Sequence, residues 1–440
     1  MIPQLQSEAA TPSSGTAPQW STAAKLAFRF GFAYFLLYVY PRPVGSLGAL
    51  VNYSNPLRDL WHVVVPWVGS HVLHLAGDLT EVANGSGDQL YDYVLLLCIA
   101  AAAALVTIVW SILDRKRQNY EQLYQWLRLF VRMVVSVAMI SYGANKLWRM
   151  QFPEPGLARY VDSFGRTSPM GLLWTTMGAS HAYSFFGGVG EMLGGLLLLV
   201  PRFTALGALL TGAVMTNVLM LNFGYDVPRK IYSLHLVAFC LFLLIPDMWR
   251  IAEFFLLGRK TQLSPPVALF RDRKMNYGVW ALQAVIGVAA LLVYCTHAYT
   301  DQVKRETHVA AALRGIWSVD QFTLEETPRP PLLTDKERWQ NVIFDEPNAV
   351  VIQSMDGVQQ RYYLRLDTSD RKLALWNFAD KHWNANLAYQ LQEADRITLE
   401  GQFGGKQVHA ELQRMPLSDP ERFLLMNRGM HWVNQFPQNR

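Results

Sequence analysis

Between residues 23 and 300 the chain consists mostly of long apolar runs, and this feature restricts its fold more than any other. A helix that crosses a bilayer needs about 20 mainly apolar residues. Charged residues make up 17% of the chain, against about 25% in soluble domains. We therefore expect an α-helical polytopic membrane bundle with about seven transmembrane helices. The predicted spans are Ala24–Tyr40, Tyr91–Leu113, Leu127–Trp148, Ala179–Val200, Ala205–Phe223, Ile231–Ile245 and Tyr277–Tyr299.

Changes in composition divide the chain into five predicted parts. The first 20 residues are rich in Ser, Thr, Pro and Ala and contain no Lys or Arg, which is typical of a disordered tail and not of a signal peptide. The parts are a tail (1–22), an N-terminal membrane extension (23–126), a four-helix membrane core (127–260), a linker with the last span (261–300) and a soluble domain (301–440).

One segment of the N-terminal extension, residues 60–77, is apolar but short for a span. It contains two tryptophans and Pro66, so we expect an interfacial or re-entrant helix. His62, His71 and His74 also lie in it, but only the last two share a helical face. Because no Cys or carboxylate is spaced with them as a ligand, no metal site is expected.

The C-terminal part, residues 301–440, has the pattern of a small antiparallel β-barrel or sandwich. Short alternating segments are separated by Asp-Gly, Asp-Arg and Gly-Gly turns. Barrels of this size either hold one small ligand or are filled by side chains. We expect a filled interior, with Trp317 and Trp376 among the filling residues. The predicted strands are 348–355, 360–367, 372–378, 386–392, 396–403 and 406–413, with 315–319 and 428–437 as candidates to close the sheet.

The net charge of +5 comes with basic clusters that flank apolar runs, at 115–117 and 271–274. This placement indicates membrane topology and not binding of nucleic acid. The better clustered set of Lys and Arg predicts a cytoplasmic N-terminus and an extracytoplasmic β-domain. The three cysteines, Cys98, Cys240 and Cys295, lie in different apolar runs, so neither a disulfide framework nor a thiolate zinc site is expected.

Residues 128–260 resemble the DoxX family of small bacterial membrane proteins. The resemblance rests on R…GANKL (132–147), GEMLGGLLLL (190–199) with the following Pro-Arg, and LNFGYDVP (221–228). The flanking parts resemble a longer subgroup with an N-terminal extension and a C-terminal β-domain. The resemblance implies a multi-pass protein of the bacterial cytoplasmic (inner) membrane. It also implies a subunit of a thiosulfate:quinone oxidoreductase, or a partner of other membrane redox subunits.

Glu191 is the first candidate for chemistry, because it lies near the middle of a predicted span. Ionisable residues inside membranes face the protein interior and often mark functional sites. The neighbouring glycines at 187, 188, 190, 194 and 195 would let another helix approach closely. Glu191 is either a proton-handling carboxyl beside a quinone or similar carrier, or a structural residue that forms an ion pair or a hydrogen bond with a neighbouring helix.

A second group of polar residues falls towards the outer ends of the predicted spans. In the functional interpretation they form a pocket below the β-domain, where Lys146 and Arg149 bind an anion and His181 and His235 relay protons. In the alternative interpretation they are interfacial side chains that extend towards the headgroups. A haem held by the two histidines has no other support. The group comprises Lys146, Arg149, His181, Asn217, Asn222, Asp226 and His235.

These observations leave three functional hypotheses open. The first is a redox-associated membrane protein linked to a quinone, with sulfur-compound oxidation as the implied process. The second is a non-enzymatic protein that binds a lipid or small anion and uses the β-barrel as an extracytoplasmic binding module. The third is a structural subunit that recruits a soluble partner through the β-domain. Lipid is the partner that all three share.

Overall fold

The computed structural model describes residues 19–40, 56–77, 79–82, 87–261, 268–307, 313–377, 380, 383–419, 421–429 and 432. The contacts form two compact units. One comprises Met1–Ser141, Leu193–Asn222 and Pro228–Ala290, and the other Tyr142–Met192, Phe223–Val227 and Leu291–Arg440. Most of the predicted N-terminal tail, up to residue 18, lies outside the described residues.

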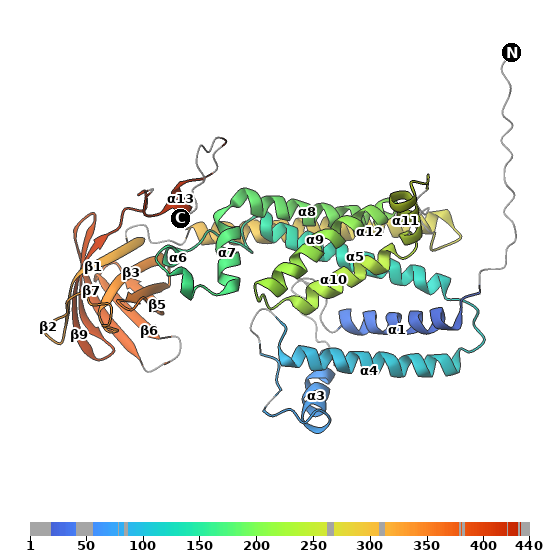
Figure 1. Cartoon of the computed structure of the whole chain (residues 1–440), viewed down its shortest axis with the longest axis horizontal. Helices are drawn as coiled ribbons and strands as arrows, with labels where there is room; N and C mark the ends of the chain where they lie inside the picture. The colour runs from blue at the N-terminus through green and yellow to red at the C-terminus, as the bar shows by residue number, and fades with distance from the viewer. Residues whose placement is uncertain are drawn as a thin grey trace, which may run out of the picture. The chain divides into compact units, whose positions relative to one another are not determined.

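Helices make up the described chain as far as residue 307 (Figure 1). They are α1 (Thr22–Val39), α3 (Pro56–His71), α4 (Leu90–Leu113), α5 (Glu121–Leu147), α6 (Leu157–Tyr160), α7 (Pro169–Ala179), α8 (His181–Leu199), α9 (Thr204–Gly224), α10 (Lys230–Leu244), α11 (Met248–Leu257) and α12 (Arg273–Thr307), with 3-10 turns η1 (Phe164–Arg166) and η2 (Pro201–Phe203). The segment that we expected to be interfacial forms the short helix α3, which contains Pro66.

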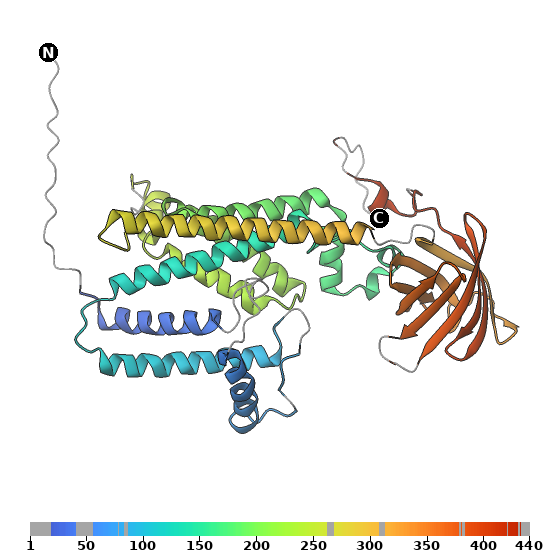
Figure 2. The same ribbon diagram turned by 180° about the vertical axis from the view of Figure 1, so that it is seen from behind.

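In the first unit α1 lies beside α4 (Figures 1 and 2). Their contact includes Arg29, which is only 5% exposed. The Arg29 guanidinium donates to Ser111 Oγ at 2.7 Å, to the Asp114 carbonyl at 3.0 Å and to Tyr120 Oη at 2.7 Å. All three guanidinium nitrogens thereby donate to protein groups, which offsets the cost of burying the charge. The Arg29 side chain thus connects α1 to the end of α4 and to the turn that follows α4.

Six described helices are long and apolar enough to cross a bilayer: α1, α4, α5, α8, α9 with η2, and α12. The pair α10 and α11 passes the same test only together, and it is bent by 82°. The count is therefore six, or seven if the pair crosses, which agrees with the expectation of about seven.

The second unit contains a closed antiparallel β-barrel of eight strands (Figure 2). Each strand pairs with the next, and β1 also pairs with β9 from Trp317 opposite Arg414 to Leu324 opposite Val408. The strands are β1 (Gly315–Leu324), β3 (Trp339–Glu346), β4 (Ala349–Ser354), β5 (Gln359–Asp367), β6 (Lys372–Asn377), β7 (Asn384–Glu393), β8 (Arg396–Phe403) and β9 (Lys406–Arg414), and the two-residue β2 (Thr327–Pro328) extends β1.

The barrel departs from the sequence-based expectation in three details. Strand β3 was not predicted; it is mostly buried, and its residues do not alternate between buried and exposed positions. Closure comes from β1 and β9, whereas segment 428–437 lies mostly outside the described residues and its described members form no strand. Trp317 is fully buried in the barrel core as expected, but Trp376 is 36% exposed and does not fill it.

The connector between α5 and α7 packs against the barrel. The Leu157 N–H donates to Asp345 Oδ2 at 2.8 Å. The side-chain amides of Gln353 and Gln359 donate to carbonyls of the connector, at Val161 (3.1 Å) and Ala158 (2.9 Å). An apolar cluster joins the two parts, and it comprises Leu157, Ile316, Ile343, Met415 and Phe423.

Helix α11 exposes Trp249, Phe255 and Leu256, an apolar surface that is typical of an interfacial helix.

Candidate functional site

Helices α5 and α8 approach closely because glycines face each other across the contact. A Cβ on Gly188 would lie 2.9 Å from the Lys146 Cβ and 3.1 Å from the Gly143 carbonyl oxygen. A Cβ on Gly143 would lie 2.8 Å from the Gly188 carbonyl oxygen. Such small-residue contacts let membrane helices pack backbone to backbone. The prediction that the glycines around Glu191 serve packing is confirmed for Gly188.

This close approach brings Lys146 of α5 against Glu191 of α8. The Lys146 ammonium donates a hydrogen bond to Glu191 Oε1, and the two form an ion pair. Glu191 is 1% exposed and Lys146 is 6% exposed. Glu191 Oε2 has no hydrogen-bond partner among the described residues. The pair is therefore a buried, half-satisfied charge pair between two candidate membrane spans.

Aromatic side chains of the connector and α7 lie next to the pair. The Lys146 Nζ lies 5.8 Å from the centroid of the Phe152 ring, a cation–π contact. Phe152 is buried and packs edge-on against Trp174, with centroids 5.1 Å apart. Arg149 does not join the pair: it donates to the Gly178 carbonyl at 3.2 Å and lies 3.9 Å from Glu154.

The arrangement allows one particular kind of chemistry. A carboxylate and an ammonium in direct contact can exist as a charged pair or, after proton transfer from Nζ to the carboxylate, as a neutral amine and acid. In a low-dielectric site the neutral form avoids the cost of burying two charges. The vacant lone pairs of Oε2 offer a second position for a proton. The pair is thus suited to hold and release a proton.

His235 occupies a separate site in the first unit. Its Nδ1 lies 2.7 Å from the Ile231 carbonyl and its Nε2 lies 2.9 Å from Tyr34 Oη. The ring stacks on Tyr38 with centroids 3.7 Å apart. The carbonyl can only accept, so Nδ1 carries the proton and Nε2 accepts from the phenol. Both ring nitrogens are in use, which leaves none for the iron of a haem in this structure.

The remaining predicted residues have other partners or are exposed. The Asn222 amide donates to the Arg229 carbonyl (3.3 Å) and to Ser233 Oγ (3.1 Å), which fastens the end of α9 to the start of α10. His181 is exposed at the first position of α8, and Asn217 is exposed on α9. Asp226 is exposed in the turn after α9, with φ of 51°. The structure thus joins Lys146 to Glu191, and a shared outward pocket for the other residues stays a prediction.

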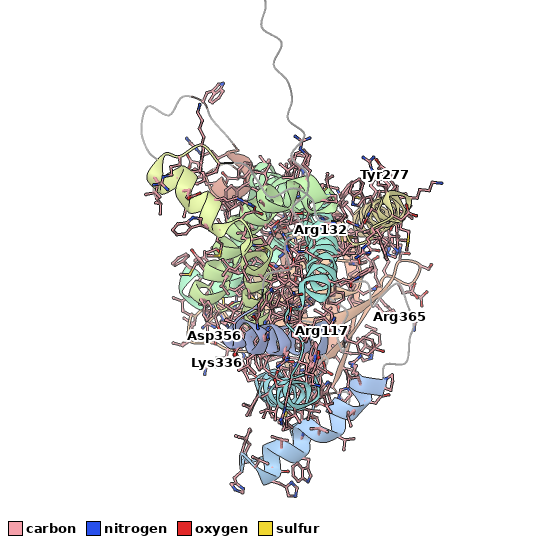
Figure 3. All side chains as sticks on the ribbon, turned by 90° about the vertical axis from the view of Figure 1, so that its right-hand side faces the viewer. Arg117, Arg132, Tyr277, Lys336, Asp356 and Arg365 are labelled. Atoms are coloured by element: carbon pink, nitrogen blue, oxygen red, sulfur yellow. The ribbon has the colours of Figure 1, made fainter. Side chains whose placement is uncertain are left out.

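Sequence reasoning did not propose a role for another buried charge, Arg132 on α5 (Figure 3). Arg132 is 8% exposed, and it donates to Thr204 Oγ1 at 3.2 Å and to Gln283 Oε1. These contacts join α5 to α9 and α12. Gln283 is a lone amide in the last apolar run, and that was the available signal. Because both direct partners are neutral, we interpret this site as a structural connection between helices.

The first unit also contains an apolar groove of about 980 Å³ between α1, α5 and α10. Aromatic rings form part of its lining, and polar side chains lie where α5 begins. Helices α1 and α5, which form two of its walls, are candidate membrane spans. The lining includes Trp20, Phe28, Phe32, Tyr124, Arg128 and Phe242.

Among the described residues, no group of three or more His, Cys, Asp or Glu side chains is arranged to hold a metal ion. Within that part of the chain the three histidines of segment 60–77 likewise form no such group. The Nε2 of His62 instead lies 3.4 Å from a carboxylate oxygen of Glu81. The Nδ1 of His71 lies within hydrogen-bond distance of Ser70 Oγ and of the Trp67 carbonyl, both in its own helix.

Comparison with known proteins gives one partial likeness. The uncharacterized protein YwoB of Bacillus subtilis (strain 168) is 36% identical over 102 residues, which cover 21% of this chain and 66% of that protein. No family model matches the chain. No solved structure matches it either. The chain therefore spans about two thirds of a relative that has no assigned function, and the DoxX resemblance stays a prediction.

Proposed function

We propose that this chain is a proton-exchanging component of a quinone-linked redox process in a bacterial cytoplasmic membrane. The observation that carries the proposal is the buried Lys146–Glu191 pair, which leaves Glu191 Oε2 without a partner among the described residues. Ionisable groups inside membrane spans are costly and commonly belong to proton pathways. The DoxX resemblance of segment 128–260 supports a quinone as the electron acceptor of this process and a sulfur compound as its electron donor.

The proton balance shows what such a pair would do. Reduction of one quinone to quinol takes up two electrons and two protons. In the process that the resemblance implies, two thiosulfate ions supply one electron each and join through a new S–S bond. The protons have to reach the carrier from water. Glu191 would take up a proton at Oε2, and Lys146 would hold the carboxylate in place and compensate its charge when the proton leaves.

The groove between α1, α5 and α10 fits the carrier in shape and polarity. An isoprenoid chain needs a long apolar surface, which the groove offers over about 980 Å³. A quinone ring needs flat apolar contacts with polar groups at its edge. Tyr124, Gln125 and Arg128 line the groove next to its aromatic residues. These residues would hold the ring, and the aromatic residues of α1 and α10 would hold the tail.

Infrared difference spectroscopy tests the proton-exchanging role without knowledge of the substrate. The difference between the spectra of the purified protein at acidic and at alkaline pH should contain the band of a protonated buried carboxyl. Glu191→Gln should remove that band, whereas the matched Glu253→Gln on α11 should retain it. A spectrum that Glu191→Gln leaves unchanged would refute the role.

A second experiment tests the carrier. Solvent extraction of the purified protein should yield isoprenoid quinone. Phe242→Ala in the groove should lower the amount of extracted quinone. Phe255→Ala, a substitution of an exposed residue of α11, serves as the control and should not lower it. Phospholipid without quinone would reject the carrier and favour the second candidate.

The second candidate is a non-enzymatic protein that binds a lipid or small anion. The closed β-barrel favours it, because eight-stranded barrels of this kind can hold one small ligand. In both candidates the N-terminus is cytoplasmic and the barrel extracytoplasmic, an orientation supported by the distribution of Lys and Arg along the chain.

A further inference from the structure

The β-barrel is not completely filled. A pocket of about 300 Å³ opens at the end of the barrel where β1 ends and β3 begins. This volume is at the lower limit of pockets that bind small molecules, which is about 300 Å³. The rest of the interior is packed by the core side chains around Trp317. The barrel thus combines a solid core with a cavity at one mouth.

Aromatic rings from different strands form the floor and walls of this pocket. Phe403 is at their centre, with the rings of Trp339 and Trp383 each 4.8 Å away and that of Tyr362 5.4 Å away. Phe322 stacks obliquely on Trp339 at 5.2 Å. Such surfaces favour a flat or linear apolar group.

Polar side chains also line this aromatic pocket, among them Ser354, Gln360 and Tyr362. Tyr362 is 4% exposed as a residue. No hydrogen bond of its hydroxyl to another described residue is present. Burial raises the pKa of Tyr362 to about 12, so the phenol keeps its proton and remains a donor at neutral pH. A donor without a partner among the described residues favours a ligand that supplies an acceptor.

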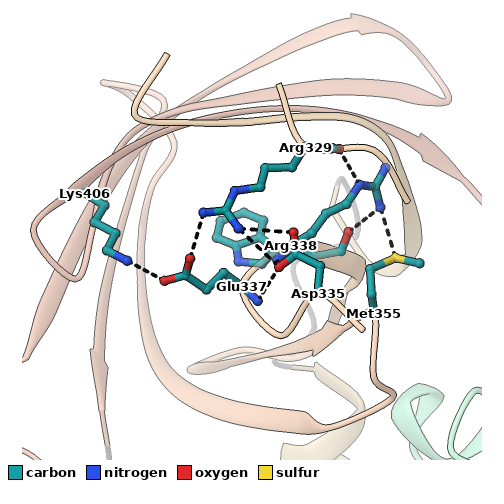
Figure 4. A network of polar contacts seen from close by, with 7 residues as sticks. Arg329, Asp335, Glu337, Arg338, Met355 and Lys406 are labelled. Atoms are coloured by element: carbon teal, nitrogen blue, oxygen red, sulfur yellow. Dashed lines mark hydrogen bonds and ion pairs between the residues drawn. The ribbon is translucent and has the colours of Figure 1, made fainter. Parts of the chain in front are cut away.

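The rim of the pocket is cationic. Two lysines, Lys336 and Lys406, and one carboxylate, Glu337, line it. Figure 4 shows that Glu337 is already engaged, because it accepts hydrogen bonds from Lys406 and, at 2.9 Å, from Arg329. The hydrogen bond from Lys406 is the main cause that lowers the pKa of Glu337. Lys336 is exposed and forms no ion pair with a described residue, although its charge, after the hydrogen bonds from Val358 and Ser354, contributes to the lowered pKa of Asp356.

A further positive charge, Arg338, directly precedes Trp339 of the pocket wall. Arg338 is 2% exposed, and its direct partners are backbone carbonyls and a sulfur atom (Figure 4). It donates to the carbonyls of Arg329 and Trp339, each at 2.9 Å, and its Nη1 lies 3.1 Å from Met355 Sδ. Burial lowers the pKa of Arg338, and the charges of Asp335 and Asp320 oppose this shift, so the guanidinium charge is partly compensated.

We propose that this pocket is a binding site for a small amphiphilic anion, with an aromatic or short alkyl body and a carboxylate or sulfonate head. The rings around Phe403 would hold the body. The head would accept hydrogen bonds from Tyr362 and pair with Lys336 at the rim. The proposal names a ligand class for the second candidate function and rests on that candidate. It does not depend on the Lys146–Glu191 pair.

Saturation-transfer NMR on the full-length protein in nanodiscs tests this site, with benzoate and hexanoate as probes. Benzyl alcohol, hexanol and benzylamine serve as neutral and cationic counterparts, and empty nanodiscs as the blank. The two anions should bind at least tenfold more tightly than their neutral and cationic counterparts. Tyr362→Phe should weaken benzoate binding about fivefold, the effect of one lost hydrogen bond.

Two rim variants complete the test. Val358→Trp should abolish binding, because Val358 lines the mouth and is already 42% exposed, so a larger side chain blocks the pocket without entering the core. Lys336→Gln should reduce the preference for anions, whereas Lys372→Gln should not, since Lys372 pairs with Asp370 on the outside of the barrel. Equal binding of anions and benzylamine, or a signal unchanged in Val358→Trp, would overturn the proposal. The infrared test of Glu191 involves none of these groups, so either proposal can fail alone.

Discussion

Removing one member of the Lys146–Glu191 pair should destabilise the protein far more than removing both. Glu191 and Lys146 are 1% and 6% exposed, and neither forms an ion pair with any other described residue. Loss of one partner from such a pair costs about 3–5 kcal/mol, because it leaves a buried charge without compensation. Replacement of both by apolar residues of similar size is often neutral or stabilising, by about 1–4 kcal/mol.

The perturbation is a double-mutant cycle with Lys146→Met and Glu191→Leu. Each single variant should lower the free energy of unfolding by about 3–5 kcal/mol, which is roughly two to three and a half powers of ten in the folding equilibrium constant. The double variant should be within about 1 kcal/mol of the wild type or more stable. The measurement is denaturant titration in lipid–detergent micelles, followed by circular dichroism.

The cycle also separates stability from function. A double variant that is as stable as the wild type but lacks the infrared carboxyl band would show that the pair is needed for proton exchange and not for folding. Single variants that lose less than about 1 kcal/mol each, or losses that simply add in the double variant, would refute the reasoning, since additivity is expected only of groups that do not interact.

Three further predictions follow from other parts of the molecule. Tyr34→Phe should destabilise the protein by about 1 kcal/mol in the same titration, because it removes the hydrogen bond to the buried imidazole, whereas the exposed Tyr93→Phe should not. The pKa of Glu337 is lowered in the folded state, mainly by the hydrogen bond from its lysine partner. Its contribution to barrel stability is therefore present above the ordinary carboxyl pKa and is lost as pH falls below it. Amide hydrogen exchange of β1 and β9, corrected for its intrinsic pH dependence, should show this loss. Protection that does not change with pH would contradict the prediction. In a cysteine-free background, an impermeant maleimide should label Asp367→Cys on intact spheroplasts and Arg117→Cys only after lysis; the reverse pattern would invert the proposed orientation.

The membrane part of the fold could be predicted because hydrocarbon imposes a single rule, that apolar helices must be about as long as the bilayer is thick. The spans at Tyr91–Leu113 and Ala179–Val200 accordingly agree with α4 and α8 within two residues at each end. The barrel strands from 348 to 413 agreed because alternation and tight turns are local signals. Strand β3 has no tight turn before it, and closure by β1 and β9 joins segments about 90 residues apart, so neither was available from a local pattern.

The site was harder to predict, because a polar residue in an apolar run indicates that a partner exists without indicating which one. Glu191 was recognised correctly as buried, yet its pairing with Lys146 depends on how α5 and α8 are packed through Gly143 and Gly188. His235 had the same signature in sequence, and its partners are a phenol and a carbonyl. The barrel pocket left no trace in sequence, since its rings come from strands that are distant along the chain.

The bond between Leu157 and Asp345 spans 188 residues of chain. At a bacterial synthesis rate of about 5–20 residues per second, roughly 10–40 s pass between the emergence of the two residues from the ribosome. During that interval the apolar side of α6 is uncovered, because the β-barrel residues that pack against it are synthesised later. A nascent chain that stalls or is cleaved before residue 315 would therefore expose this apolar surface. Quality-control proteases would then have a feature that distinguishes incomplete chains from complete ones.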